Sequence, residues 1–337
     1  MDSTPKRVGR MAVVLAAAVV GAALGWVLFV RVPGGNLAAL LGIVLAIVLA
    51  LVATRFSSGL AASLFPPYNV AKVSVEGPIV RRAGGTLPSS PTATPADAIV
   101  EQIERADEDD AVDALIVHLN TPGGEVVPSE DIRAAAAAFE GPTIAYATDT
   151  CASGGYWIAS GCDRVFARSG SIVGSIGVLA SRVTAADLLD RVGLTYERLV
   201  AGDYKDAGLG LREMDEDDRA YLQGIVDDYY EEFVDRVTDG RDLDPDAVRE
   251  TEARVYLGEE AREQGLVDAI GDLDDVEEHL EDELDRAVTV RDFEPETGLA
   301  ARIRGGTQAV SYAFGAGITS ALADTEGRGG PQEFTFR

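Results

Sequence analysis

Two kinds of apolar pattern divide the chain. Residues 11–30 and 37–53 are almost wholly apolar and contain no charged residue. A helix needs about 20 apolar residues to span the hydrocarbon core of a bilayer, and the second run is at the short end of that range. The pattern therefore predicts two transmembrane helices, joined as a hairpin. From residue 69 onward, short apolar runs alternate with polar stretches, as in a globular domain.

Basic residues flank the predicted hairpin and indicate its orientation. Lys6, Arg7 and Arg10 precede it, Arg31 lies in its bend and Arg55 follows it. Because lysine and arginine are enriched on the cytoplasmic side, both ends of the hairpin, and the large domain with them, are expected in the cytoplasm. A cleavable signal peptide would explain the first apolar run but not the second. We therefore predict a two-span protein of the cell membrane.

The globular part alternates between strand and helix patterns. Strands are predicted at 70–79, 114–119 and 142–147. Helices are predicted from 95 to near 107 and from about 129 to 139, and residues 156–159 are predicted to form the first turns of a third. Strands that alternate with helices are typical of an α/β fold with a mostly parallel sheet. Residues 83–95 are rich in Gly, Ser, Thr and Pro, and are predicted to form a mobile loop.

The composition along the chain predicts five segments. They are a basic N-terminal tail (1–10), the two spans (11–53), a linker (54–68), the globular domain (69–285) and a C-terminal tail (286–337). The last segment loses clear periodicity after Arg291, and its end is rich in glycine. Such composition is typical of partly disordered chain.

Charge is distributed as unevenly as hydropathy. The formal net charge is −27, but residues 1–68 carry +4, which leaves about −31 on the other 269 residues. Such an acidic body repels nucleic acid, so a nucleic-acid binder is excluded. High acidity also keeps proteins soluble in concentrated salt, where screening weakens self-repulsion. We therefore expect an extreme halophile as the source, and a halophilic archaeon in particular.

The chain offers few ligands for a metal. Cys151 and Cys162 are the only cysteines and there are two histidines, so no zinc-type cluster is present in the sequence. Asp242-Leu-Asp-Pro-Asp resembles the start of a calcium loop, but Ala247 stands where that loop requires glycine. Both cysteines are expected to be buried and free, because eleven residues of helix between them would exceed disulfide reach. No metal and no cofactor are predicted.

Ser153 lies between the predicted strand at 142–147 and the predicted helix at 156–159. A strand-to-helix junction presents free N–H groups and the positive end of the helix, which favour negative charge. Gly154 and Gly155 allow another backbone to approach closely. Ser153 is thus a candidate nucleophile, and the N–H of Gly154 is a candidate oxyanion donor. The alternative is a serine N-cap beside a packing glycine.

A second glycine-rich turn, Thr121-Pro-Gly-Gly, follows the predicted strand at 114–119. In parallel α/β folds, ligands gather at the carboxyl ends of the strands. Gly123 or Gly124 could therefore supply a second oxyanion donor opposite Gly154. The alternative is an ordinary Pro-Gly turn.

Few residues are available to activate Ser153. His118 lies within a predicted buried strand and His279 lies in an acidic helix, so neither is placed for a Ser-His-Asp triad. Lys205 remains as the candidate base. A lysine base must be neutral, which desolvation favours and its two flanking aspartates oppose. The alternative is a surface lysine in an acidic loop.

Taken together, several motifs resemble those of the signal peptide peptidase A family of membrane-anchored serine peptidases. They are Thr121-Pro-Gly-Gly, Ala152-Ser-Gly-Gly-Tyr-Trp-Ile-Ala, Gly174-Ser-Ile-Gly-Val and Gly202-Asp-Tyr-Lys-Asp-Ala-Gly. Gly258-Glu-Glu-Ala-Arg-Glu-Gln-Gly also resembles the C-terminal helix and turn of that family. The resemblance covers roughly residues 70–280 and is specific as a set.

The resemblance implies the fold of Clp protease and the crotonases, a superhelix of repeated β-β-α units. It implies Ser153 as the nucleophile and Lys205 as the general base of a Ser-Lys dyad, with Ser175 orienting the lysine, and so makes 69–285 a Ser-Lys peptidase domain. Relatives with one catalytic copy form homo-oligomeric rings in which neighbouring subunits share each active site. This chain shows no internal duplication, so the resemblance implies the same kind of ring for it. The expected substrates are cleaved signal peptides and other apolar peptides derived from the membrane.

Other functions fit some of the same residues. A Ser-Lys peptidase of the kind associated with stomatin-like proteins would cleave a specific membrane-protein tail. A crotonase-like acyl-CoA enzyme would use the same oxyanion geometry without a nucleophile. A non-catalytic membrane scaffold would leave Ser153 and Lys205 without a chemical role.

Overall fold

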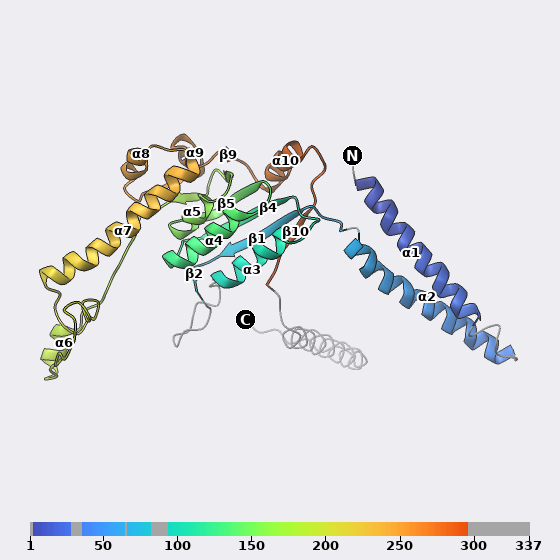
Figure 1. The fold of residues 1–337 in the computed structure, drawn as a ribbon, viewed down its shortest axis with the longest axis horizontal. Helices are drawn as coiled ribbons and strands as arrows, with labels where there is room; N and C mark the ends of the chain where they lie inside the picture. Colours follow the sequence, from blue (N-terminus) through green and yellow to red (C-terminus); the bar gives the residue numbers. More distant parts are fainter. Residues whose placement is uncertain (1–2, 28–35, 65, 82–93, 296–337) are drawn as a thin grey trace, which may run out of the picture. The chain divides into compact units, whose positions relative to one another are not determined.

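A computed structural model gives the structure of residues 3–27, 36–64, 66–81 and 94–295 (Figure 1). The helices are α1 (Ser3–Trp26), α2 (Asn36–Leu64), α3 (Ala96–Asp107), α4 (Val126–Ala138), α5 (Gly154–Ala159), α6 (Ala186–Arg191), α7 (Glu216–Arg241), α8 (Pro245–Glu250), α9 (Gly258–Glu263) and α10 (Leu273–Leu284). The strands are β1 (Val70–Glu76), β2 (Ile79–Val80), β3 (Thr94–Pro95), β4 (Ala114–Thr121), β5 (Thr143–Ala152), β6 (Arg164–Ala167), β7 (Ile172–Gly174), β8 (Val255–Leu257), β9 (Ala269–Ile270) and β10 (Val290–Asp292).

The two N-terminal helices form a close pair. A Cβ atom on Gly25 of α1 would lie 2.7 Å from the Cα atom of Ala46 in α2, so the two helices are in contact at a glycine, which has no side chain. Small residues at such a crossing allow two helix backbones to approach. The described parts of both apolar runs are helical, as predicted.

The prediction that this pair crosses a membrane twice is not supported. Within the described ranges, no helix combines the length and the apolar character that a crossing requires. Both helices extend beyond the apolar runs into polar sequence: α1 begins before Lys6, and α2 continues past Arg55. The bend that contains Arg31 lies outside the described residues.

The body of the protein is built on one mostly parallel sheet. Its main path has the strand order β10-β1-β4-β5-β6-β9, and β7 extends it by pairing with the end of β5 and with β8. Every pair is parallel except β7 with β8. The predicted α/β fold with mostly parallel strands is confirmed. Short β2 and β3 form a separate pair beside the turn after β4.

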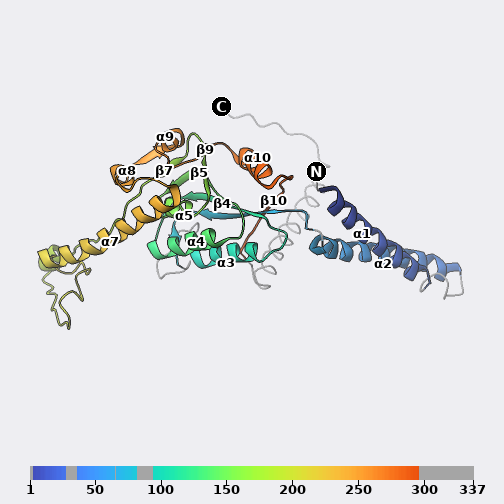
Figure 2. The same ribbon diagram turned by 45° about the horizontal axis from the view of Figure 1, so that its top comes forward.

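Helices cover both faces of this sheet (Figure 2). Side chains alternate between the faces along each strand, so Val73 and Val75 of β1 pack toward α3, α4 and α5. Val70 of the same strand packs with Val276 and Leu280 of α10 on the other face. Strands buried on both faces are near-continuous apolar runs, which explains why the segment at 114–119 was recognisable as a strand.

Some element boundaries differ from the sequence expectations. β5 runs to Ala152, beyond the predicted end at 147, because its second half pairs with β7 despite the polar residues Thr148 and Thr150. β10 pairs with β1 although it lies within the segment predicted as a C-terminal tail (286–337). The rest of that segment, from residue 296, lies outside the described residues, as does most of the predicted loop at 83–95.

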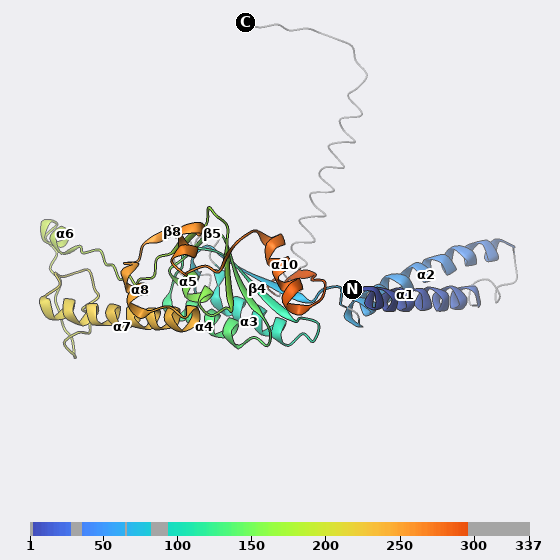
Figure 3. The ribbon, with the colours of Figure 1, turned by 90° about the horizontal axis from the view of Figure 1, so that it is seen from above.

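Residues 180–215 form an extension that we call the arm. Its helix α6 lies beyond the N-terminal end of α7, away from the sheet (Figures 1 and 3). The carboxylate of Asp206 is buried and accepts hydrogen bonds from Arg198 (2.9 Å) and Arg212 (3.1 Å). Arg212 also binds Asp218 in the first turn of α7. This network attaches the arm to the outer end of α7.

The inner half of α7 belongs to the core of the body. Phe233, Val234 and Val237 are fully buried there. Burying one such side chain stabilises a fold by about 1.5–3 kcal/mol. Close packing continues at Gly240, where a Cβ atom would lie 1.8 Å from the carbonyl oxygen of Ser160. One helix therefore connects the core to the arm.

We predict that Asp206→Asn loosens the arm without unfolding the body. Hydrogen bonds from Arg198 and Arg212 hold the pKa of Asp206 well below its usual range. The stabilisation that Asp206 provides is therefore present above the ordinary carboxyl pKa and is lost as the pH falls through the lowered value. Limited proteolysis should cut the arm at least about tenfold faster in the variant. Asp203→Asn, at an exposed neighbouring position, is the control; equal cleavage rates for wild type and Asp206→Asn would contradict the prediction.

Candidate active site

Ser153 occupies the junction between β5 and α5, as the sequence predicts. Its backbone has φ 52° and ψ −120°, a conformation that residues with a Cβ atom rarely adopt. Two hydrogen bonds hold it there: Ser153 N–H donates to the carbonyl of Gly174 (2.9 Å), and Trp157 N–H donates to the carbonyl of Ser153 (2.9 Å). A strained serine at a strand-to-helix turn is the geometry of a nucleophile elbow, in which the hydroxyl is exposed to a ligand.

The Thr121-Pro-Gly-Gly turn packs directly against this junction. Gly123 has φ 94°, and a Cβ atom on it would lie 2.5 Å from Gly154 N and 2.9 Å from Ser153 Cβ. Only glycine fits both this conformation and this contact. The turn at the end of β4 and the start of α5 are therefore in backbone contact.

The two glycines of the turn differ in what their N–H groups do. Gly123 N–H donates to Thr121 Oγ1 (3.0 Å), and Thr121 Oγ1 donates in turn to the carbonyl of Gly77 (2.6 Å). Gly124 N lies toward Gly154 instead, 3.1 Å from where a Cβ atom on Gly154 would be. The N–H groups of Gly124 and Gly154 are thus brought together beside Ser153.

Ser175 follows β7 as Ser153 follows β5. Ala152 and Gly174 are direct partners in these neighbouring parallel strands, so the two serines leave adjacent strand ends side by side. Ser175 also has a positive φ, 54°, and its N–H donates to the carbonyl of Arg254 (2.8 Å). Backbone strain at two adjacent positions is typical of a functional site.

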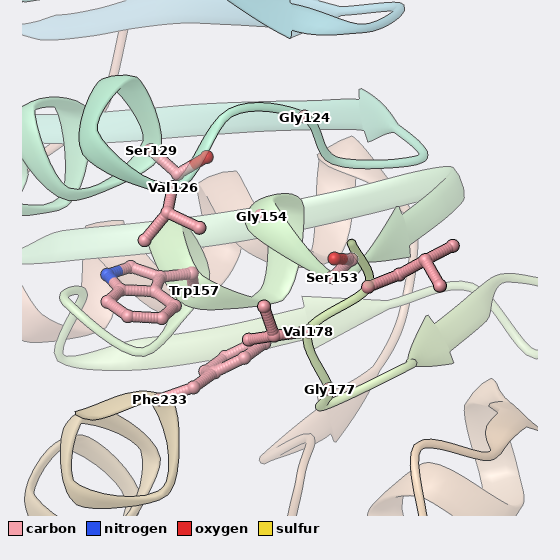
Figure 4. A pocket seen from close by; sticks show the side chains of 10 residues that line it. Gly124, Val126, Ser129, Ser153, Gly154, Trp157, Gly177, Val178 and Phe233 are labelled. Carbon is pink, nitrogen blue, oxygen red and sulfur yellow. The ribbon is translucent and has the colours of Figure 1, made fainter. Parts of the chain in front are cut away.

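A pocket of about 170 Å³ opens beside Ser153 (Figure 4). Ser129, Gly124 and Gly154 line its polar side, and the apolar lining residues are Val126, Trp157, Val178, Leu179 and Phe233. The rings of Trp157 and Phe233 are 4.6 Å apart. The pocket therefore places an apolar wall next to a serine hydroxyl.

Lys205 is not near Ser153 within one chain. Lys205 is exposed in the arm, next to Asp206. Asp206 is linked through Arg212 to Asp218, in the first turn of α7. From Asp218 to Phe233, at the pocket, α7 rises about 22 Å. The structure therefore brings together Ser153, Gly154, Gly123, Gly124 and Ser175, but not Lys205.

The histidines lie away from the pocket. His118 Nδ1 is 3.2 Å from Ser74 Oγ, and His118 Nε2 is 3.1 Å from Thr148 Oγ1, on the α10 face of the sheet. Burial lowers the pKa of His118. In α10, His279 Nε2 is 3.7 Å from Glu283 Oε2. Neither histidine lines the pocket beside Ser153.

The cysteines are buried and free, as predicted. Burial raises the pKa of both thiols, to about 12 for Cys162. The prediction that a continuous helix separates Cys151 from Cys162 is wrong, because α5 is six residues long and covers only part of the segment between them. Among the described residues, no group of three His, Cys, Asp or Glu side chains is arranged to hold a metal ion.

Several pocket residues were not identified from the sequence. Trp157 was expected only as a buried helix residue, and neither Ser129 nor Phe233 was singled out. The one available signal was the apolar spacing of Phe233, Val234 and Val237, which indicates a buried helix face but not what it faces.

Comparison with known proteins identifies the family. Residues 136–287 match the family model described as peptidase family S49. The chain is 34% identical over 219 residues to an inferred protease of Synechocystis. The matched region covers 62% of this chain and 78% of that protein.

The chain belongs to peptidase family S49.

It is also 33% identical over 218 residues to an inferred signal peptide peptidase SppA of Enterococcus faecium (64% of this chain, 63% of that protein). With the chloroplastic serine protease SPPA of Arabidopsis thaliana it shares 30% identity over 205 residues (57% of this chain, 30% of that protein). The chain thus spans less than two thirds of these two relatives. As an S49 peptidase, this chain is a serine peptidase, as predicted. Its sheet of mostly parallel strands fits the family. The two alternatives from another class, an acyl-CoA enzyme and a non-catalytic membrane scaffold, are not supported.

The close contact at Gly123 makes a stability prediction. Gly123→Ala should lower the free energy of unfolding by about 2 kcal/mol, because it adds both a positive-φ penalty and a steric overlap with Gly154. Chemical denaturation would measure the change. Gly170→Ala is the matched control, since a Cβ atom there would meet nothing within 4 Å. An unchanged denaturation midpoint for Gly123→Ala would show that the turn does not constrain the junction.

Proposed function

We propose that this S49 peptidase uses a Ser-Lys dyad in which Ser153 is the nucleophile and Lys205 of a neighbouring subunit is the general base. The observation that carries the proposal is the strained Ser153 junction, with an apolar pocket and two backbone N–H groups beside it. In the proposed reaction, Lys205 Nζ takes the proton of Ser153 Oγ as the oxygen attacks a peptide carbonyl. The lysine then gives a proton to the leaving amine. Water, activated by the same lysine, releases the acyl-enzyme.

The oxyanion of the tetrahedral intermediate would be held by the N–H groups of Gly154 and Gly124. Gly124 is preferred to Gly123 because the Gly123 N–H is already bonded to Thr121 Oγ1. Each such donor contributes about 3 kcal/mol to the stabilisation of the transition state. Gly123 would then serve by permitting the close backbone contact.

The arm has the properties of a subunit interface. Several of its apolar side chains are largely exposed, among them Val183 (90%), Leu188 (60%) and Leu199 (88%). Apolar surface of this kind marks an interaction site. We propose that the arm packs on the next subunit of a homo-oligomeric ring and brings Lys205 to that subunit's Ser153 and Ser175. Burial at this interface would favour the neutral amine, and the carboxylate of Asp206 is already engaged by two arginines.

The pocket and the hairpin support apolar substrates at a membrane. An apolar cavity of about 150 Å³ holds a molecule as large as benzene, so a pocket of about 170 Å³ suits one aliphatic or aromatic side chain. The hairpin also exposes a set of apolar side chains: Met11, Leu15, Val19, Ile47, Leu51 and Phe56. We propose that the hairpin buries this surface in the cell membrane, with the peptidase on the cytoplasmic side. Cleaved signal peptides would then be substrates, and the body (69–285) would have the superhelical fold of Clp protease.

A tail-specific peptidase associated with stomatin-like proteins is the remaining candidate of the same class. It would share Ser153 and Lys205 but would require one particular apolar sequence. Cleavage profiles on signal peptides and on membrane-protein tails would separate the two.

The shared dyad predicts subunit complementation. Ser153→Ala and Lys205→Ala should each abolish peptide hydrolysis by the detergent-solubilised protein. In rings reassembled from equal amounts of the two variants, about a quarter of the sites would combine an intact serine with an intact lysine. Hydrolysis should therefore return to about a quarter of the wild-type rate. Mixing Lys205→Ala with the double variant is the control, and failure of the first mixture to exceed it would exclude a shared site.

The acidic body predicts dependence on salt. A net charge of −27 destabilises a compact chain through self-repulsion, which salt screens. We propose that the chain works in a halophile, so its activity and unfolding temperature should both rise from dilute buffer to molar KCl. Peptide hydrolysis and thermal unfolding across a KCl series would test this. Full activity in dilute buffer would argue against the halophile.

A further inference from the structure

Glu130 of α4 lies at the meeting point of the three helices that build the pocket. Its carboxylate accepts hydrogen bonds from Trp157 Nε1 of α5 (2.6 Å) and from Arg133 Nε and Nη2 of its own helix (2.7 and 2.8 Å). It also lies 3.2 Å from Arg236 Nη2 of α7. One half-buried carboxylate thus joins α4, α5 and α7.

The same three helices supply apolar lining of the pocket. Val126 comes from α4, Trp157 from α5 and Phe233 from α7, and they converge in Figure 4. Phe233 lies one helical turn before Arg236, on the same face of α7. The carboxylate therefore binds the indole of one wall residue and the helix that carries another.

The charge of Glu130 is maintained in this environment. Burial alone would raise its pKa, but the hydrogen bonds from Arg133 and Trp157 outweigh burial and hold the pKa below its usual range. A charged acceptor makes stronger hydrogen bonds than a neutral one. The indole is consequently held by the strongest kind of partner that a carboxyl side chain provides.

We propose that Glu130 is a positioning residue that sets the size selectivity of the pocket by fixing Trp157. The inference rests on the proposed function, in which this pocket receives the substrate side chain next to the bond that Ser153 attacks. With the indole fixed, the pocket keeps a defined apolar wall, and a large aliphatic side chain gains contacts that alanine cannot make. Without Glu130, the indole and α7 lose their common anchor, and this discrimination falls.

The test compares two peptides that differ only in the residue before the scissile bond, leucine or alanine. Wild type should favour leucine in kcat/KM. Glu130→Ala should reduce the leucine-to-alanine ratio at least about tenfold, chiefly through KM for the leucine peptide. Glu130→Gln keeps an acceptor for the indole and should retain the ratio within about threefold. A ratio in Glu130→Ala within about twofold of wild type would overturn the inference.

Glu232→Ala is the matched control. Glu232 is also bonded to Arg236 (3.3 Å) but comes from α7 itself and is more exposed. Removing it changes the charge around Arg236 and leaves the anchor of Trp157 in place. It should keep the leucine-to-alanine ratio within about twofold of wild type. A loss of selectivity equal to that of Glu130→Ala would mean that general charge around α7, and not the indole anchor, is responsible.

Fluorescence gives a readout that does not depend on activity. The chain has two tryptophans, so Trp26→Phe leaves Trp157 as the only tryptophan, whose emission is excited selectively over that of the tyrosines. In that background Glu130→Ala should make the Trp157 emission more accessible to acrylamide, and Glu130→Gln should not. Unchanged quenching in Glu130→Ala would contradict the positioning role.

Two further measurements separate the possible failures. If Glu130→Ala does not fold, Glu130→Asp and Trp157→Phe replace it. Each should lower the ratio on its own, because the shorter Asp side chain withdraws the carboxylate from the indole, and Glu130→Asp should lower it no further in the Trp157→Phe background. Independent, additive effects would overturn the inference. Covalent labelling of wild type by a fluorophosphonate tests the proposed function separately. Absence of label on Ser153 would overturn the proposed function. If the enzyme is labelled and active, and Glu130→Ala keeps the leucine-to-alanine ratio of wild type, only the role of Glu130 is overturned.

Discussion

The site depends on a backbone contact in which side chains are absent. The turn after β4 lies against the first residues of α5, and this is possible because Gly123 and Gly154 have no Cβ atom. That contact lies beside Ser153, which has a positive φ, and brings the backbone nitrogen of Gly124 close to Gly154. Strain of this kind, about 1–3 kcal/mol for each residue, persists only where the surroundings over-determine it. Here the core strands β4, β5 and β7 provide those surroundings.

The local part of this arrangement could be predicted from the sequence. Ser153 stands between an apolar strand pattern and an apolar helix pattern, and Thr121-Pro-Gly-Gly ends another strand. Because parallel strands end at the same edge of a sheet, both turns were expected to meet. Each of these signals lies within a few residues of the element that it defines. The α/β fold was predictable for the same reason.

The long-range part could not be predicted in this way. Phe233 reaches the pocket only because α7 packs against Trp157 of α5, and Glu130 meets Trp157 through the packing of α4 against α5. No periodicity records such a meeting. The place of Lys205 is a similar case, since its local sequence does not reveal that the arm leaves the body. Hydropathy located the helices of the hairpin, but the membrane crossing that it predicted is not supported among the described residues.

Helix α7 has 26 residues and connects two parts of the protein. Its C-terminal half is buried in the core at Phe233, and its first turn binds the arm through Asp218. Gly224 lies between these two contacts, where a Cβ atom would meet nothing within 4 Å. A glycine inside a helix costs about 1 kcal/mol relative to alanine, so the helical turn around Gly224 is less stable than an alanine there would make it. We therefore expect α7 to bend more readily at Gly224 than along its packed half, and such a bend would move the arm while Phe233 stays buried.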